Sequence, residues 1–303
     1  MTRRGLTLVE LLIAIIVSAI VGAALVRLTI GQARFMGQQE AWRSARSVSR
    51  SGINRMVSDI RVVENGSQAA LGGLQAAAAG GQDFTLRVPY AFGVVCLAAG
   101  AAATVSLLPI DSAMYAAPGQ SGFAIRNSTG VYTYYTSTVT NLAPAAGVTT
   151  NCSVAVAPDM PINAGTSGAL PSINGSPAGR VVALTATVNL NPVPAKGAIV
   201  FLYRRVRYEF KASLSVPGRN GLWRTMVDGG STEEIAAPFN NSARVNFFVL
   251  NNAAAQAAVP ANLYDVRGLE LVLNGQSENT PAGSAAPKTA NVTTSVFFEN
   301  RPD

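Results

Sequence analysis

A long apolar segment near the N-terminus constrains this 303-residue chain more than any other feature. Between Leu6 and Val26 lie 21 residues with one charged side chain, Glu10. As an α-helix this segment would be about 31 Å long, which matches the hydrocarbon core of a bilayer, about 30 Å thick. Arg3 and Arg4 precede it, and such residues favour a cytoplasmic N-terminus. We therefore expect one membrane-spanning helix, followed by the rest of the chain.

Two simple interpretations of this segment are a secretory signal peptide and a plain membrane anchor. Glu10, near the start of the segment, argues against the plain anchor, and the length of the segment argues against the signal peptide. A secretory signal peptide has an apolar region of only about 7–15 residues, followed by a small-residue cleavage site. A plain membrane anchor gains nothing from Glu10, because a carboxylate in hydrocarbon is costly and by default marks a function. The segment therefore predicts a functional helix rather than a simple signal or anchor.

The hexapeptide Gly5-Leu6-Thr7-Leu8-Val9-Glu10 resembles the class III leader of type IV prepilins and type II secretion pseudopilins. The resemblance implies that a prepilin peptidase cuts between Gly5 and Leu6 and methylates the new N-terminus at Leu6, where the family more commonly has Phe. It also implies assembly with other pilin or pseudopilin subunits. In a bundle of such helices, Glu10 would pair with the cationic amine of Leu6 on a neighbouring subunit and set its axial register.

This resemblance divides the chain into a leader at residues 1–5, a transmembrane and amphipathic helix at 6–66, and a β-rich globular domain at 67–303. It implies a single-pass protein of the inner membrane, with the globular domain in the periplasm. The subunit would then enter a pilus or pseudopilus.

The helical pattern continues beyond the membrane segment, so we expect one helix from about Leu6 to about Val63, about 85 Å long. An apolar stripe and a basic face follow helical spacing in its second half: Ile53, Met56, Ile60 and Val63, and Arg43, Arg46 and Arg50. We favour docking of the stripe on the protein's own sheet over a partner interface. The arginines are either a solvated face or, in a filament, partners for acidic neighbours.

After the helix, short alternating or apolar runs separated by Gly, Pro and Asn predict an antiparallel β-rich domain, and hence an α+β fold. Residues 67–81 are interpreted as a loop without chemistry, and residues 143–179 as a long surface insertion. The candidate strands are Phe84–Val88, Phe92–Leu97, Thr104–Leu108, Gly122–Arg126, Val131–Thr138, Val181–Leu190, Ala198–Lys211, Leu222–Val227, Arg244–Leu250, Leu263–Leu273 and Val292–Glu299.

The second half of the chain also resembles the PilW-like minor pilins and the J-type pseudopilins. In these proteins a strand pair, an "LxR" hairpin strand and a closing strand recur in order. The matching segments are Tyr208-Glu209-Phe210, Leu222-Trp223-Arg224, Arg244–Leu250, Val266–Leu273 and Val296–Arg301.

Enzyme chemistry is poorly represented in the sequence. The chain has no histidine, which removes Ser-His-Asp and Cys-His catalysis and histidine-based zinc sites. Asp228–Glu234 places several acidic oxygens on a turn, but it lacks the spaced pattern of a calcium loop, so we favour a solvated hairpin. We expect no cofactor, no metal and no catalytic residues.

The cysteine pair and the net charge have structural interpretations that we prefer to functional ones. Cys96 and Cys152 are the whole thiol content, and an isolated pair in an exported protein is typical of a disulfide. The net charge of +7 fits a basic leader and one basic helix face, although DNA or an anionic surface ligand would also suit it.

Three functions follow from these observations. The first is a minor pilin that helps filament initiation or tip assembly. The second is a J-type pseudopilin of type II secretion. The third is a tip adhesin or DNA-uptake pilin. Gene neighbourhood would separate the first two, and DNA affinity that falls steeply with salt would favour the third.

Overall fold

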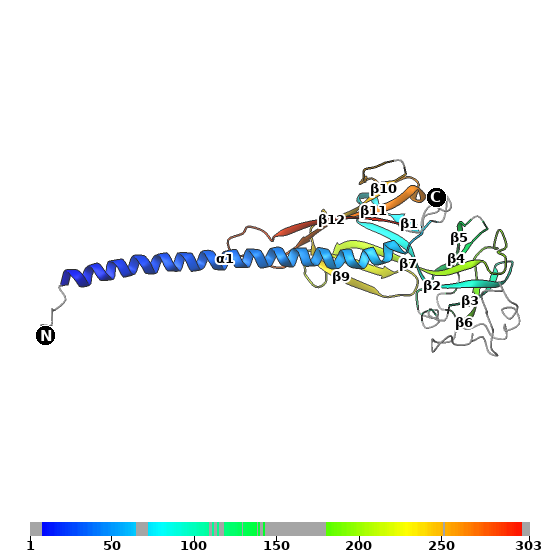
Figure 1. Cartoon of the computed structure of the whole chain (residues 1–303), viewed down its shortest axis with the longest axis horizontal. Helices are drawn as coiled ribbons and strands as arrows, with labels where there is room; N and C mark the ends of the chain where they lie inside the picture. Colours follow the sequence, from blue (N-terminus) through cyan, green and yellow to red (C-terminus); the bar gives the residue numbers. More distant parts are fainter. Residues whose placement is uncertain are drawn as a thin grey trace.

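The computed structural model describes residues 8–64, 72–108, 118–128, 130–137, 180–250 and 252–298, together with Asp111, Met114, Val139 and Leu142. A long N-terminal helix leads into an antiparallel β-sheet domain (Figure 1). This arrangement confirms the predicted α+β class.

The helix α1 runs from Leu8 to Arg61 and contains 54 residues. At 1.5 Å per residue it is about 81 Å long. Its first part projects alone from the globular domain, and its second part lies along the sheet (Figure 1). It ends two residues before the predicted Val63, whose N–H still bonds to the Ile60 carbonyl oxygen at 3.1 Å.

Twelve strands form one antiparallel sheet within the described residues, with the main order β10-β11-β9-β8-β7-β2-β3-β6. Strand β1 pairs with β2, β12 with β11, and β4 with both β5 and β7. The bounds are β1 Leu74–Ala77, β2 Asp83–Ala99, β3 Ala102–Leu107, β4 Gly122–Arg126, β5 Tyr132–Thr136, β6 Arg180–Thr185, β7 Ile199–Ala212, β8 Asn220–Met226, β9 Thr232–Phe239, β10 Arg244–Val249, β11 Val266–Gln276 and β12 Thr289–Phe297. Two short 3₁₀ helices, Ala79–Gly81 and Leu263–Asp265, precede β2 and β11.

The sheet carries two main apolar clusters, one under the helix and one beyond its C-terminal end. The long strands β2 and β7 run through both, so Leu86 and Val206 belong to the first cluster while Val95 and Leu202 belong to the second. The distal end of the domain is therefore held to the helix-bound part by continuous strands.

One strand replaces two predicted ones. The predicted segments Phe84–Val88 and Phe92–Leu97 are both part of β2, because pairing with β7 continues across Pro89. Proline has no N–H for the sheet ladder, and the register shift between Pro89 and Ala91 accommodates it. Proline therefore marks a bulge here and not the end of a strand.

The interpretation of residues 67–81 as a loop was wrong for its second half. Strand β1 begins at Leu74, which is buried and lies opposite Leu86 of β2. Alanine and glycine have weak strand preference, so this segment takes its structure from tertiary pairing with β2. The predicted insertion at residues 143–179 lies outside the described residues.

The sequence also missed β9, which follows the turn at Asp228 and pairs with β8. Because it contains Glu233 and Glu234, this segment has the composition of a turn, and a strand was not predicted there. In the structure Glu233 lies opposite Arg224 of β8, so the acidic residues belong to a strand.

Candidate functional site

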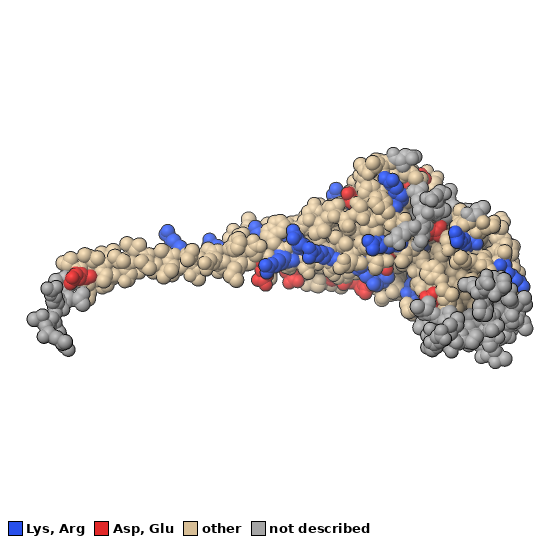
Figure 2. All heavy atoms as spheres, in the orientation of Figure 1, with Lys and Arg blue, Asp and Glu red and all other residues tan. Residues whose placement is uncertain are grey.

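The projecting part of α1 carries the predicted processing and assembly residues. Every residue from Leu8 to Met36 is exposed. The helix contains an 18-residue window of mean hydropathy 2.7, of which none is buried within the protein. Figure 2 shows this part as mostly uncharged, with acidic atoms near its N-terminal end. By length and composition it can cross a membrane.

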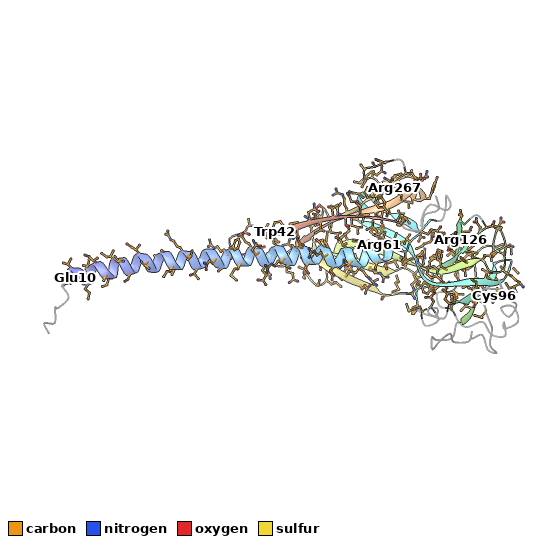
Figure 3. All side chains as sticks on the ribbon, viewed as in Figure 1. Glu10, Trp42, Arg61, Cys96, Arg126 and Arg267 are labelled. Atoms are coloured by element: carbon orange, nitrogen blue, oxygen red, sulfur yellow. The ribbon has the colours of Figure 1, made fainter. Side chains whose placement is uncertain are left out.

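Glu10 lies in the first turn of α1, at the end farthest from the sheet domain (Figure 3). Gly5 and Leu6 lie outside the described residues. Cleavage between them, methylation at Leu6 and pairing with Glu10 therefore stay predictions. The structure adds that Glu10 is on the same continuous helix that docks on the domain, so its axial position is fixed relative to the sheet.

Comparison with known families gives one match. Residues 1–26 match the family model described as the prokaryotic N-terminal methylation motif. The motif indicates a type IV pilin-like or pseudopilin-like protein, anchored through one N-terminal apolar helix. The chain matches no curated protein and no solved structure. The motif covers only the N-terminal segment, and the role of the rest of the chain is inferred from its own contacts.

The second half of α1 packs closely on the sheet because its inner face is made of small residues. Ala41, Ala45, Ser49 and Gly52 are buried there, spaced by three or four positions. A Cβ atom at Gly275 of β11 would lie 2.3 Å from the Ala45 carbonyl oxygen. The Ser49 hydroxyl accepts a hydrogen bond from the Gly275 N–H at 3.0 Å. The helix backbone therefore rests directly on the strand backbone.

Nearer its C-terminal end, the helix contributes larger side chains to the core. Met56, Ile60 and the following Val63 are fully buried, and Ile53 packs against the same cluster. The preferred interpretation of this stripe, docking on the protein's own sheet, is confirmed. The opposite face of the helix, with Arg43, Arg46 and Arg50, is exposed.

A buried polar cluster joins this helix to three strands. Asp59 on α1 accepts a hydrogen bond from the Tyr208 hydroxyl on β7 at 2.7 Å and an ion-paired one from Arg224 Nε on β8 at 3.0 Å. Arg224 also contacts Glu233 of β9 at 3.4 Å. Burial, together with the charge of Asp59, raises the pKa of Tyr208, so its hydroxyl stays a donor.

The role of Asp59 was not predicted from the sequence, although its position on the helix indicated it. Asp59 stands next to Ile60 on the buried stripe, and a carboxylate on a buried face requires a partner. Tyr208 and Arg224 lie opposite each other on β7 and β8. Both residues therefore hold the helix to the sheet through Asp59.

A second buried acid follows the helix. Glu64 is almost fully buried, and its carbonyl oxygen accepts a hydrogen bond from the Tyr134 hydroxyl at 2.9 Å. Burial raises the pKa of its side chain to about 8, and the positive charge of Arg126 only partly opposes this shift. Glu64 is therefore mostly protonated at neutral pH.

Cys96 is fully buried on β2, whereas Cys152 lies outside the described residues, so the disulfide stays a prediction. The acids of the Asp228–Glu234 segment have separate partners: Asp228 binds Arg205, and Glu234 accepts from the Leu214 and Ser215 N–H groups. Within the described ranges no group of three His, Cys, Asp or Glu could hold a metal ion.

Proposed function

We propose that this protein is a minor pilin, a structural subunit that helps the initiation or tip assembly of a type IV pilus. The observation that carries the proposal is the projecting, apolar first half of α1 with Glu10 in its first turn. The methylation motif at residues 1–26 supports the same role. The exposed apolar surface suits storage in the inner membrane and later burial among other pilin helices.

Processing would prepare the helix for assembly. A prepilin peptidase would cut between Gly5 and Leu6, remove the basic leader and create a new amino group at Leu6. Glu10 stands four residues later, one helical turn away. In a bundle of offset helices the carboxylate would meet the amine of a neighbouring subunit. A buried charge without such a partner is strongly unfavourable, so the pair would set the register of the incoming subunit.

The chief alternative is a J-type pseudopilin of type II secretion, which would use the same helix and the same processing. The order of strands β7, β8, β10, β11 and β12 suits both families. The two assignments differ in the filament that the subunit enters. Isolation of surface pili from the native cells and detection of this chain in them would favour the pilus, and its absence there together with loss of protein secretion on deletion would favour the pseudopilus.

The assembly role of Glu10 is tested by replacing it with Leu and comparing the amounts of subunit in filaments and in membranes. Ser18→Leu is the matched control. It replaces another polar residue of the same exposed apolar segment with Leu, but it removes no charge. We expect both variants to insert and to be cleaved after Gly5. Only Glu10→Leu should be lost from filaments, at a cost of roughly 3–5 kcal/mol for the broken pair. Equal incorporation of the two variants would refute the register-setting role.

A further inference from the structure

The sheet domain has a hollow at its far end, away from the assembly helix. It lies between the β4–β5 hairpin and the segment at residues 192–198, and its volume is about 420 Å³. Arg126 at the end of β4 lines it, and Figure 3 places this residue at the end of the molecule opposite Glu10. In a filament subunit held by α1, this end is the part free to meet molecules other than the neighbouring helices.

The lining residue Tyr135 is held in place by the surrounding protein. Tyr135 of β5 is 5% exposed, and its ring stacks on Phe123 with centroids 5.5 Å apart. Its hydroxyl accepts a hydrogen bond from the Asn191 N–H at 3.2 Å and donates one to the Asn191 carbonyl oxygen at 3.3 Å. These bonds tie the hairpin to the start of the opposite wall, so the hollow is preformed, as small-molecule sites usually are.

The lining carries positive charge. Arg126 belongs to the hairpin wall and Lys196 to the opposite wall, and none of the described lining residues is acidic. Neither cation forms a salt bridge with any described residue. Arg126 Nε donates to the Gly130 carbonyl oxygen at 3.1 Å, which orients the guanidinium and leaves its terminal nitrogens as further donors.

The nearby carboxyl of Glu64 does not cancel this charge at neutral pH. Arg126 is the cation that acts on Glu64, but burial keeps that carboxyl mostly protonated. The hollow therefore keeps two cationic groups, one of which is a guanidinium suited to bidentate recognition of a carboxylate.

The other lining groups suit a hydroxylated ligand with one apolar face. Asn127, Ser128 and Thr133 supply amide and hydroxyl groups, and Pro192 and Val193 supply an apolar wall. A nucleic acid strand fits less well. It prefers an extended basic groove with open aromatic faces, whereas the ring of Tyr135 is stacked inside the protein.

From these features we propose that the hollow between the β4–β5 hairpin and residues 192–198 binds an acidic sugar, with Arg126 and Lys196 holding its carboxylate. This site would give the subunit a ligand-binding function separate from filament assembly. It depends on the sheet domain alone, so it stands whether the filament is a pilus or a pseudopilus.

The test uses the full-length chain in detergent micelles and ligand-observed NMR titration. The probes are glucuronate, glucose as its neutral analogue, inorganic phosphate and a short oligothymidylate. We expect glucuronate to bind at least tenfold more tightly than glucose, because hydrogen bonds to charged groups are worth roughly 1.5–3 kcal/mol. Arg126→Gln and Lys196→Gln should each weaken glucuronate binding by about tenfold.

Arg43→Gln is the matched control, because it removes the same charge from the exposed face of α1. It should leave glucuronate binding unchanged. Lys196→Gln alters an exposed side chain and keeps the test valid if Arg126→Gln fails to fold. Equal binding of glucuronate and glucose would overturn the proposal, as would equal effects of Lys196→Gln and Arg43→Gln. Tighter binding of phosphate or the oligonucleotide than of glucuronate would also overturn it, and would assign the hollow to phosphate-bearing ligands.

Discussion

Replacing Asp59 with Ala should remove the main polar connection between the helix and the sheet. Asp59 is 9% exposed and accepts hydrogen bonds from the fully buried Tyr208 hydroxyl and from Arg224, which is 8% exposed. Breaking a buried ion pair on one side typically costs 3–5 kcal/mol. Arg224 keeps its 3.4 Å contact with the half-exposed Glu233, which favours the lower end of that range. We expect a loss of about 3 kcal/mol in the free energy of unfolding.

The assay is urea unfolding of the full-length protein in detergent micelles, monitored through the fluorescence of Trp223 on β8. Trp223 adjoins Arg224 and is mostly buried, and the second tryptophan, Trp42, is replaced by Phe in every variant. Arg55→Ala is the control. It removes an ion pair to Glu233 that is 3.8 Å long and about half exposed on both sides, and it should cost less than about 0.5 kcal/mol.

A double-mutant cycle tests whether Asp59 and Arg224 act together. Asp59→Ala and Arg224→Met remove the two sides of one interaction, so the double variant should be more stable than the sum of the single losses predicts, by about 2 kcal/mol. Additive losses would show that the two residues act independently. A loss for Asp59→Ala no larger than that for Arg55→Ala would show that the cluster does not hold the helix in place.

Three further predictions concern processing, pH and the thiols. Intact-mass measurement of the protein from native membranes should find residues 1–5 removed after Gly5 and one methyl group added at Leu6; a retained Met1 would contradict this. Folding raises the pKa of Glu64 from 4.5 to about 8, so the folded state holds a proton that the unfolded state releases. The free energy of unfolding should therefore fall as pH rises from about 5 to 8, by up to about 1.4 kcal/mol per pH unit. Glu64→Gln should abolish that dependence in urea unfolding, and an unchanged slope would count against it. Thiol labelling of unreduced, denatured protein should modify neither Cys96 nor Cys152, and labelling of both would show that they are free thiols.

The N-terminal part of this protein was predictable from its amino-acid order alone. The hydropathy of Leu6–Val26 and the position of Glu10 are properties of consecutive residues. A bilayer and a processing peptidase likewise interact with one continuous segment of the chain. The same holds for the long helix, because its 3.6-residue periodicity is local. The apolar stripe that includes Met56 and Ile60 was therefore recognisable before its partners on the sheet were known.

The contacts between polar and small residues of distant segments became known only from the three-dimensional structure. Ser49 and Gly275 are 226 positions apart, and Asp59 and Arg224 are 165 apart. Their contact depends on strand order and register, which alternation along a single strand does not fix. The hollow beside Arg126 has the same origin, because one of its walls is the β4–β5 hairpin and the other is a segment more than 50 residues later. The residue pattern of one segment does not predict which distant segment it contacts. The free energy that joins the two segments comes from burial and pairing across the whole sheet.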